Sequence, residues 1–134
     1  MIIGNPEKAR EFFATKLACT TGPTEVKDML DRGENVTIID VRHPHVYAKG
    51  RIPGAINMPQ GQWQTAKGAC KDKLNIVYCY SQTCHLAAAA ALELASQGYR
   101  VMEMEGGFAA WTMSGLPIDA ADATNTTQSA TTSA

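Results

Sequence analysis

The sequence predicts an α/β fold with a parallel sheet, on three observations. Two short runs, residues 36–40 and 75–79, are almost continuously apolar, which is typical of strands buried on both faces of a parallel sheet. Residues 85–98 are rich in alanine and end in a glycine, which indicates a helix and its stop. This segment separates the second run from a third, residues 100–104. A strand, a helix and a strand in this order form a βαβ unit.

Two further helices are expected ahead of the first strand. Residues 5–7, Asn-Pro-Glu, are typical of a helix start, because they supply a capping side chain, a proline for the first turn and an acid near the positive helix end. Phe12, Phe13 and Leu17 give this helix an apolar stripe, so we expect an accessory helix that covers one edge of the domain. A second helix is predicted to begin at residues 22–25, Gly-Pro-Thr-Glu.

The ends of the three strands indicate where a site would lie. The third run alternates more between apolar and polar residues than the first two, so we expect it nearer an edge of the sheet. In such sheets ligands bind outside the carboxyl ends of the strands. These ends hold residues 40–42, 79–84 and 105–107, so the thiol of Cys79 stands at the usual place of chemistry.

Length and charge exclude several classes of protein. The 134 residues suit one domain, and 12 basic against 13 acidic residues give a net charge of −1 without a long basic run. No stretch is apolar enough for a membrane helix, and the N-terminus carries charge where a secretory signal needs an apolar run. We therefore expect a soluble cytoplasmic protein without a nucleic-acid or membrane partner.

The chain is expected to divide into three parts. Residues 1–19 form the accessory helix and its lead-in, and residues 20–118 form the domain. Residues 119–134 contain no side chain that is large and apolar, so they cannot offset the entropy lost on ordering. We predict that this last segment is a disordered low-complexity tail.

The segment after Cys79 is expected to turn sharply, because a helix begins five or six residues later. A short turn from a strand into a helix tends to aim successive backbone N–H groups inward, which makes an anion-binding cradle. Such a cradle lowers the pKa of a thiol, and the thiolate is the nucleophilic form. Cys79 is therefore a candidate covalent catalyst; the alternative is that it is a small buried residue.

The other cysteines, Cys19, Cys70 and Cys84, do not form a metal-binding pattern with it, because no pair of Cys-x2-Cys knuckles occurs. We expect no metal site and no cofactor. In a reducing cytosol all four cysteines should be thiols by default rather than disulfides.

Three separated motifs resemble those of rhodanese-like domains, in that family's order and spacing. They match its opening signature, its strand with the catalytic cysteine and its closing signature. The motifs are Ile39-Asp40-Val41-Arg42 with Tyr47, Gly50 and residues 52–59 (IPGAINMP); Ile76-Val77-Tyr78-Cys79; and Glu105-Gly106-Gly107 with Trp111, Gly115 and Leu116-Pro117. The resemblance covers about residues 20–118 and implies a central parallel sheet flanked by helices on both faces.

The activity that this resemblance implies is that of a sulfurtransferase. In such domains the cysteine thiolate takes a sulfane sulfur from a small donor anion such as thiosulfate, from polysulfide or from a protein persulfide. It holds the sulfur as a cysteine persulfide and passes it to a thiol or protein acceptor. By resemblance, Cys79 is the catalytic residue. The loop that binds the anion and holds the persulfide comprises Tyr80, Ser81, Gln82, Thr83, Cys84 and His85.

This loop departs from the family pattern, which commonly reads Cys-Arg-Ser-Gly-Asn-Arg. Here it reads Cys-Tyr-Ser-Gln-Thr-Cys, so both arginine positions and the glycine are lost. Arg51, a possible supporting residue, stands where the family often has histidine. Because charge-assisted contacts are the strong ones, binding of a dianion such as thiosulfate should weaken more than thiolate formation. We therefore expect weak thiosulfate activity.

Four further residues near the loop have two interpretations each. Cys84 is either a resolving thiol that attacks the Cys79 persulfide and forms a disulfide, or a small residue that seats the first helical turn. His85 is either a cation that partly replaces the missing arginine or an exposed polar residue. Asp40 and Arg42 are expected to support the site by fixing a turn through charge-assisted hydrogen bonds rather than to catalyse.

Two functions follow from these observations. The first is a rhodanese-type sulfurtransferase that uses a Cys79 persulfide. The alternative is a catalytically weak module of the same fold that binds or senses redox state through the Cys79/Cys84 thiol pair. A phosphatase or arsenate reductase of related architecture is disfavoured, since their longer cysteine loops are closed by an arginine and position 84 supplies no cation.

Overall fold

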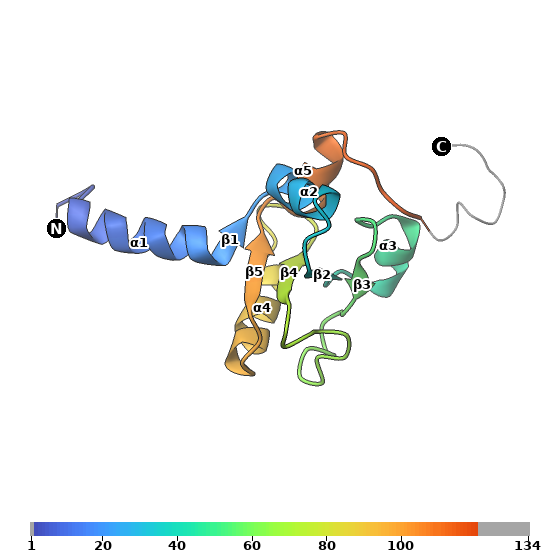
Figure 1. Ribbon diagram of the computed structural model, residues 1–134. Coiled ribbons are helices and arrows are strands. Elements are labelled where there is room, and N and C mark those ends of the chain that lie inside the picture. The colour runs from blue at the N-terminus through green and yellow to red at the C-terminus, as the bar shows by residue number, and fades with distance from the viewer. Residues whose placement is uncertain (1, 121–134) are drawn as a thin grey trace.

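The computed structural model describes residues 2–120 (Figure 1). Five parallel strands form one sheet in the order β1-β5-β4-β2-β3. The predicted α/β fold is therefore confirmed. The elements in chain order are α1 (Pro6–Cys19), β1 (Thr20–Thr21), α2 (Pro23–Asp31), β2 (Val36–Asp40), α3 (Pro44–Lys49), β3 (Ile56–Asn57), β4 (Leu74–Tyr78), α4 (Leu86–Ser96), β5 (Val101–Met104) and α5 (Gly107–Met113).

The three predicted strands are present within one residue of their predicted bounds. β4 is central and pairs with β2 on one side and β5 on the other. β5 lies one strand from the edge, because the two-residue strand β1 pairs with it. The short strands β1 and β3 were not predicted, since two residues are too few to show a periodic pattern.

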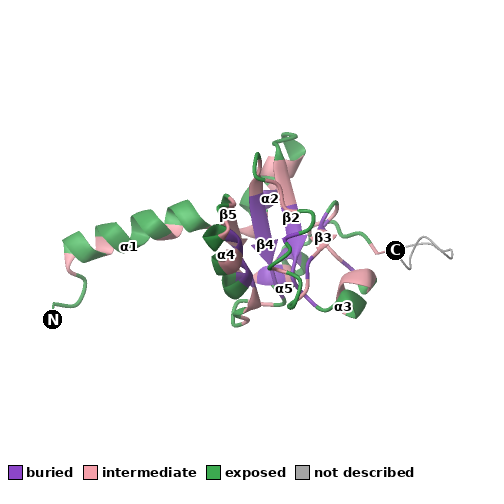
Figure 2. Ribbon diagram, turned by 90° about the horizontal axis from the view of Figure 1, so that it is seen from below, coloured by how far each residue is buried: buried purple, intermediate pink, exposed green. Residues whose placement is uncertain are grey.

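Helices cover both faces of the sheet, as the family resemblance implies. Successive strand residues point to opposite faces, so β4 contributes to two cores. Val77 packs with Leu94 of α4 in one core, and Ile76 packs with Trp111 of α5 in the other. Figure 2 shows β2 and β4 as the buried centre between these layers. The loop that follows β4 therefore leaves the sheet from its central strand.

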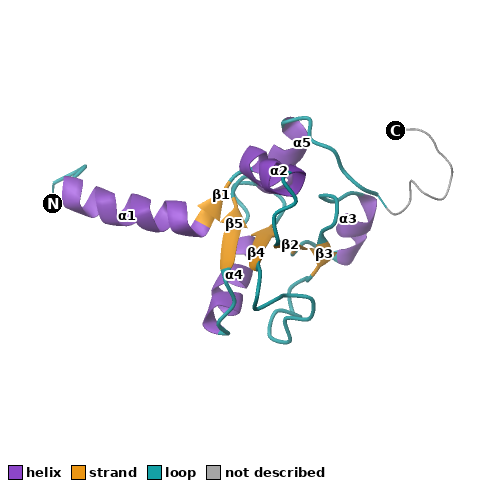
Figure 3. Cartoon of the chain, in the orientation of Figure 1, coloured by secondary structure: helices purple, strands orange, loops and turns teal. Residues whose placement is uncertain are grey.

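Helix α1 does not cover an edge of the domain, so that expectation was wrong. Its start is as predicted, because the Asn5 side chain accepts a hydrogen bond from the Lys8 amide at 3.0 Å. The helix nevertheless projects from the domain (Figure 1), and Phe12, Phe13 and Leu17 are exposed. The chain passes directly from α1 into β1 (Figure 3). Among residues 2–120, β1 is the edge strand on this side, and α1 extends away from it instead of packing along it.

The C-terminal part of the described chain returns to the domain. Asp119, which we assigned to the tail, exchanges two backbone hydrogen bonds of 2.9 Å with Arg51. This residue therefore pairs with the folded domain. Residues 121–134, the rest of the predicted tail, lie outside the described residues. None of the helices within residues 2–120 has the length and apolar character to cross a membrane, and a cytoplasmic location stays a prediction.

Candidate active site

The loop that follows β4 is held by the first turn of α5. The Phe108 amide donates to the Cys79 carbonyl at 2.8 Å, and the Ala109 amide donates to the Tyr80 carbonyl at 2.9 Å. The N-terminal amides of a helix have no partner within the helix, so they are available for such bonds. The two carbonyl groups at the start of the loop therefore point toward α5.

This anchoring fixes the direction of the loop amides. All described peptide bonds are trans, and a trans peptide places its N–H opposite to its C=O. The amides of Tyr80 and Ser81 consequently face away from α5. In the described part of the chain, none of the four amides from Tyr80 to Thr83 has a hydrogen-bond acceptor. The loop thus presents a run of free backbone donors, as a cradle for an anion requires.

Gly107 allows the close contact between α5 and the loop. A Cβ at this position would lie 2.6 Å from the Cys79 carbonyl oxygen and 2.7 Å from the Ser81 nitrogen. Its φ of +62° is also in the left-handed region that favours glycine. The sequence analysis placed this glycine at a strand end and in the closing family signature but did not predict its contact with the loop; two adjacent glycines after a strand are a signal of a close backbone approach.

Cys79 and Cys84 form a disulfide across this loop, with their Cα atoms 6.5 Å apart. The expectation that all four cysteines are thiols is therefore wrong for this pair. The loop folds back on itself, because the Cys84 amide donates to the Ser81 carbonyl at 3.2 Å, and this turn brings the two sulfur atoms together. Cys19 and Cys70 are free thiols.

The two sulfur-bearing residues differ in accessibility. Cys79 is only 2% exposed and belongs to the core beneath α4. Cys84 is half-buried and packs on the rim of the same core. With the disulfide formed, Cys84 is therefore the half that solvent reaches more readily.

A hollow of about 330 Å³ opens beside the loop. The Tyr80 hydroxyl accepts a hydrogen bond from the His43 amide at 3.2 Å, which joins the loop to the end of β2. No lysine, arginine or carboxylate lines this hollow. The lining residues are Val41, His43, Pro59, Gln60, Tyr80 and Leu86.

A buried ion pair supports the strand ends behind the loop. Asp40 and Arg42 are at most 2% exposed, and their closest charged atoms are 2.6 Å apart. The Tyr78 hydroxyl donates to Asp40 Oδ2 at 2.6 Å and accepts from the Ile52 amide at 3.1 Å. Burial, and then the charge of Asp40, raise the pKa of Tyr78, so its phenol stays protonated.

Arg42 connects this ion pair to the loop. Its guanidinium carbon lies 4.1 Å from the centre of the Phe108 ring, and the Phe108 amide binds the Cys79 carbonyl. Burial alone would lower the pKa of Arg42, but hydrogen bonds and charge from Asp40 outweigh it and raise that pKa. Asp40 and Arg42 thus form a buried ion pair in contact with the element that anchors the loop, and their supporting role stays a prediction.

The structure gives the two other candidate cations no contact with the sulfur atoms among the described residues. Arg51 donates to the Tyr47 carbonyl at 3.2 Å, and its guanidinium carbon lies 4.7 Å from the centre of the Tyr47 ring. His85 is exposed at the N-cap of α4 and makes no side-chain capping bond. Its charge acts on Glu103, whose pKa is raised by burial first and by Glu105 second, while His85 and Lys16 oppose the rise.

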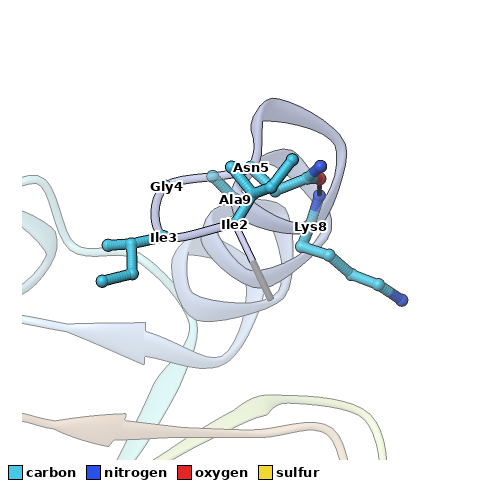
Figure 4. A pocket seen from close by; sticks show the side chains of 6 residues that line it. All are labelled: Ile2, Ile3, Gly4, Asn5, Lys8 and Ala9. Atoms are coloured by element: carbon cyan, nitrogen blue, oxygen red, sulfur yellow. Dashed lines mark hydrogen bonds between the residues drawn. The ribbon is translucent and has the colours of Figure 1, made fainter.

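A second hollow beside the first turn of α1 is separate from the loop. Its lining comprises residues 2–5, Lys8 and Ala9 (Figure 4). Because α1 projects from the domain, this hollow lies at the far end of the helix from the sheet. Its lining holds no cysteine, histidine or carboxylate, and we assign no chemistry to it. Within residues 2–120 no group of three metal-ligating side chains occurs either.

Comparison with known proteins gives consistent matches. The family model for the rhodanese-like domain matches residues 22–114. A sulfurtransferase from Allochromatium vinosum is 37% identical over 87 residues, which are 63% of this chain and 79% of that protein. An HTH-type transcriptional regulator from Mycobacterium tuberculosis is 34% identical over 95 residues, 69% of this chain, and the match spans only 42% of the regulator.

The fold also matches that of a solved structure. The BH2092 protein from Bacillus halodurans has a TM-score of 0.80 at 30% identity, covering 87% of this chain and 88% of that one. The matched region of the family model includes β4, the cysteine loop and the first turn of α5. Motifs, topology and site therefore coincide, and the chain belongs to the rhodanese-like domain family.

Proposed function

We propose that this protein is a sulfurtransferase that carries sulfane sulfur as a persulfide on Cys79. The observation that carries the proposal is the run of free amides from Tyr80 to Thr83, next to a cysteine at the end of the central strand. Backbone donors at such a turn stabilise a thiolate and a terminal persulfide anion alike. Relatives named sulfurtransferase and thiosulfate sulfurtransferase support the same reaction class.

The hollow beside the loop favours donors of low charge. Its lining offers no lysine or arginine to a dianion, and Tyr80 occupies a position where the family often has arginine. We therefore propose organic persulfides and polysulfides as better donors than thiosulfate. In the loading step the Cys79 thiolate attacks the outer sulfur of a donor R–S–SH, a new S–S bond forms on Cys79, and R–S⁻ leaves. A thiol or protein acceptor then takes the sulfur.

The disulfide makes reduction a precondition of loading, because a bonded Cys79 sulfur is no nucleophile. The test uses reduced, desalted Cys84→Ser protein, in which the adduct cannot be consumed by the second thiol. It is mixed with cysteine persulfide or thiosulfate, and intact masses are measured. We expect a gain of one sulfur that Cys79→Ala abolishes and Cys70→Ser leaves unchanged. An adduct that survives Cys79→Ala, or no adduct with either donor, would overturn the proposal.

A second candidate function is a redox-sensing module. The disulfide between Cys79 and Cys84 favours it, since a thiol pair that closes within one loop can report oxidation. This function predicts that the reduced protein takes up no sulfur from any donor, yet forms the disulfide with a mild oxidant. Uptake of one sulfur on Cys79 argues against it.

A further inference from the structure

We propose that Cys84 turns the sulfur carrier into a sulfide-releasing reductase of persulfides. The inference rests on the proposed Cys79 persulfide. The Cys84 thiolate attacks the Cys79 sulfur, a Cys79–Cys84 disulfide forms, and the bond to the outer sulfur breaks so that hydrosulfide leaves with both bonding electrons. Two thiol sulfurs are oxidised to a disulfide and one sulfane sulfur is reduced to sulfide, so the electrons balance.

The geometry supports this step because its product is the arrangement observed. The two Cα atoms are 6.5 Å apart, within the range that a disulfide can bridge. With the disulfide formed, the neighbouring elements are regular: β4 is paired up to Tyr78, and α4 begins at Leu86. The Cys84 amide bonded to Ser81 also keeps the loop folded back. Attack on Cys79 therefore requires no unfolding of the domain.

The leaving group favours cleavage of the outer bond. Exchange at a disulfide sulfur is faster when the departing thiol has the lower pKa, and hydrosulfide is a better leaving group than an alkyl thiolate. The free amides of Tyr80 to Thr83 follow Cys79 directly in the chain, and backbone donors at such a turn stabilise negative charge. An intramolecular thiol also needs no diffusional encounter, so it competes well with external acceptors.

After sulfide release the disulfide must be reduced again, which we call the return step. The exposure of the two cysteines indicates which sulfur the reductant attacks. A dithiol reductant must restore both thiols, and it attacks one sulfur of the disulfide first. Cys79 is 2% exposed, whereas Cys84 is half-buried, so the attack falls on Cys84. Cys79 then leaves as the thiolate, which the loop amides stabilise. The sum over both steps converts a persulfide and a dithiol into a thiol, hydrosulfide and the oxidised dithiol.

The experiment is a single turnover without reductant. Reduced, desalted full-length protein receives cysteine persulfide, and both sulfide and remaining thiols are measured against a protein-free control. We expect the parent and Cys70→Ser to release one sulfide per chain and to lose two thiols. Cys84→Ser and Cys84→Ala should keep the sulfur on Cys79 and lose sulfide release, with circular dichroism spectra that match the parent.

The outcomes separate the two proposals. If Cys84→Ser loads sulfur and the parent also holds it without releasing sulfide, the reductase inference is wrong and the carrier function stands. Sulfide release by Cys84→Ser at the parent rate would likewise show that the reductase inference is wrong and leave the carrier function standing. If Cys84→Ser and Cys84→Ala fold but never load, both proposals fall. For the return step, oxidised parent treated with glutathione should carry the mixed disulfide on Cys84, and a mixed disulfide on Cys79 contradicts the assigned direction.

Discussion

Replacing Tyr78 by phenylalanine tests the buried network that supports the strand ends. The substitution removes one oxygen atom and keeps the ring, so core packing is preserved. Two hydrogen bonds are lost: the donation to Asp40 at 2.6 Å and the acceptance from the Ile52 amide at 3.1 Å. Both partners are 0% exposed, so water does not replace the hydroxyl.

The expected cost follows from the two bonds. A hydrogen bond to a charged group contributes about 1.5–3 kcal/mol, and a buried donor left without an acceptor costs about 1–3 kcal/mol. Asp40 still accepts hydrogen bonds from three nitrogen atoms of Arg42, which reduces the cost of losing the bond from Tyr78. We therefore expect Tyr78→Phe to lower the free energy of unfolding by about 3 kcal/mol. That is a large share of the roughly 5–15 kcal/mol of an ordinary domain.

The assay is equilibrium unfolding in urea, with reductant in all samples so that the Cys79–Cys84 pair stays in one state. Tyr99→Phe is the matched control, because within residues 2–120 the Tyr99 hydroxyl makes no hydrogen bond, and its expected change is below about 0.5 kcal/mol. A loss under about 1 kcal/mol for Tyr78→Phe, at an unchanged m-value, would refute the reasoning that this hydroxyl satisfies two buried groups.

Three further predictions concern the loop and β5. Gly107→Ala should lower the free energy of unfolding in urea by about 2–4 kcal/mol, because the new Cβ would lie 2.6–2.8 Å from backbone atoms. Gly54→Ala is the control: its φ is also positive, but open space surrounds it, so the loss should be smaller. Tyr80→Arg in the Cys84→Ser background should raise the loading of Cys79 by thiosulfate about tenfold or more, since a charge-assisted contact contributes about 1.5–3 kcal/mol. The same increase in the uncharged control Tyr80→Gln would contradict a charge effect. Glu103→Gln should stabilise the protein at neutral pH and not at pH ~3, read as the difference in Tm from the parent. Burial raises the folded pKa of Glu103, so its ionisation costs stability once pH rises through the unfolded value, and a pH-independent difference would argue against this cause.

The strands and the alanine-rich helix could be predicted because their signals are local. A strand buried on both faces reads as an apolar run, which placed β2 at its observed bounds and β4 within one residue. The apolar stripe of α1 was misinterpreted for a physical reason. A periodic pattern shows which face of a helix is apolar, but it does not show what covers that face.

The position of Cys79 was predictable, but the state of the loop was not. The strand-to-helix turn alone indicates inward amides, while the residues that hold the turn, Gly107 and Phe108, follow more than 20 residues later in the sequence. A spacing of five residues between two cysteines is compatible with many Cα distances. Only the folded turn at Ser81 brings Cys84 within bridging range of Cys79.

The lack of arginine in the loop and the presence of Cys84 both agree with the proposed reduction of persulfides of low charge. An arginine at the loop end would attract a dianionic donor, whereas the hollow at Tyr80 has no lysine or arginine in its lining, which is why we propose donors of low charge. In the proposed reaction the thiol at position 84 supplies electrons to the bound sulfur, which an arginine cannot do. The residue at position 84 that we expect to weaken thiosulfate binding is thus also the second thiol that the proposed sulfide release requires. If Cys84→Arg gained thiosulfate loading on Cys79 and lost sulfide release together, the two effects would be traced to this single position.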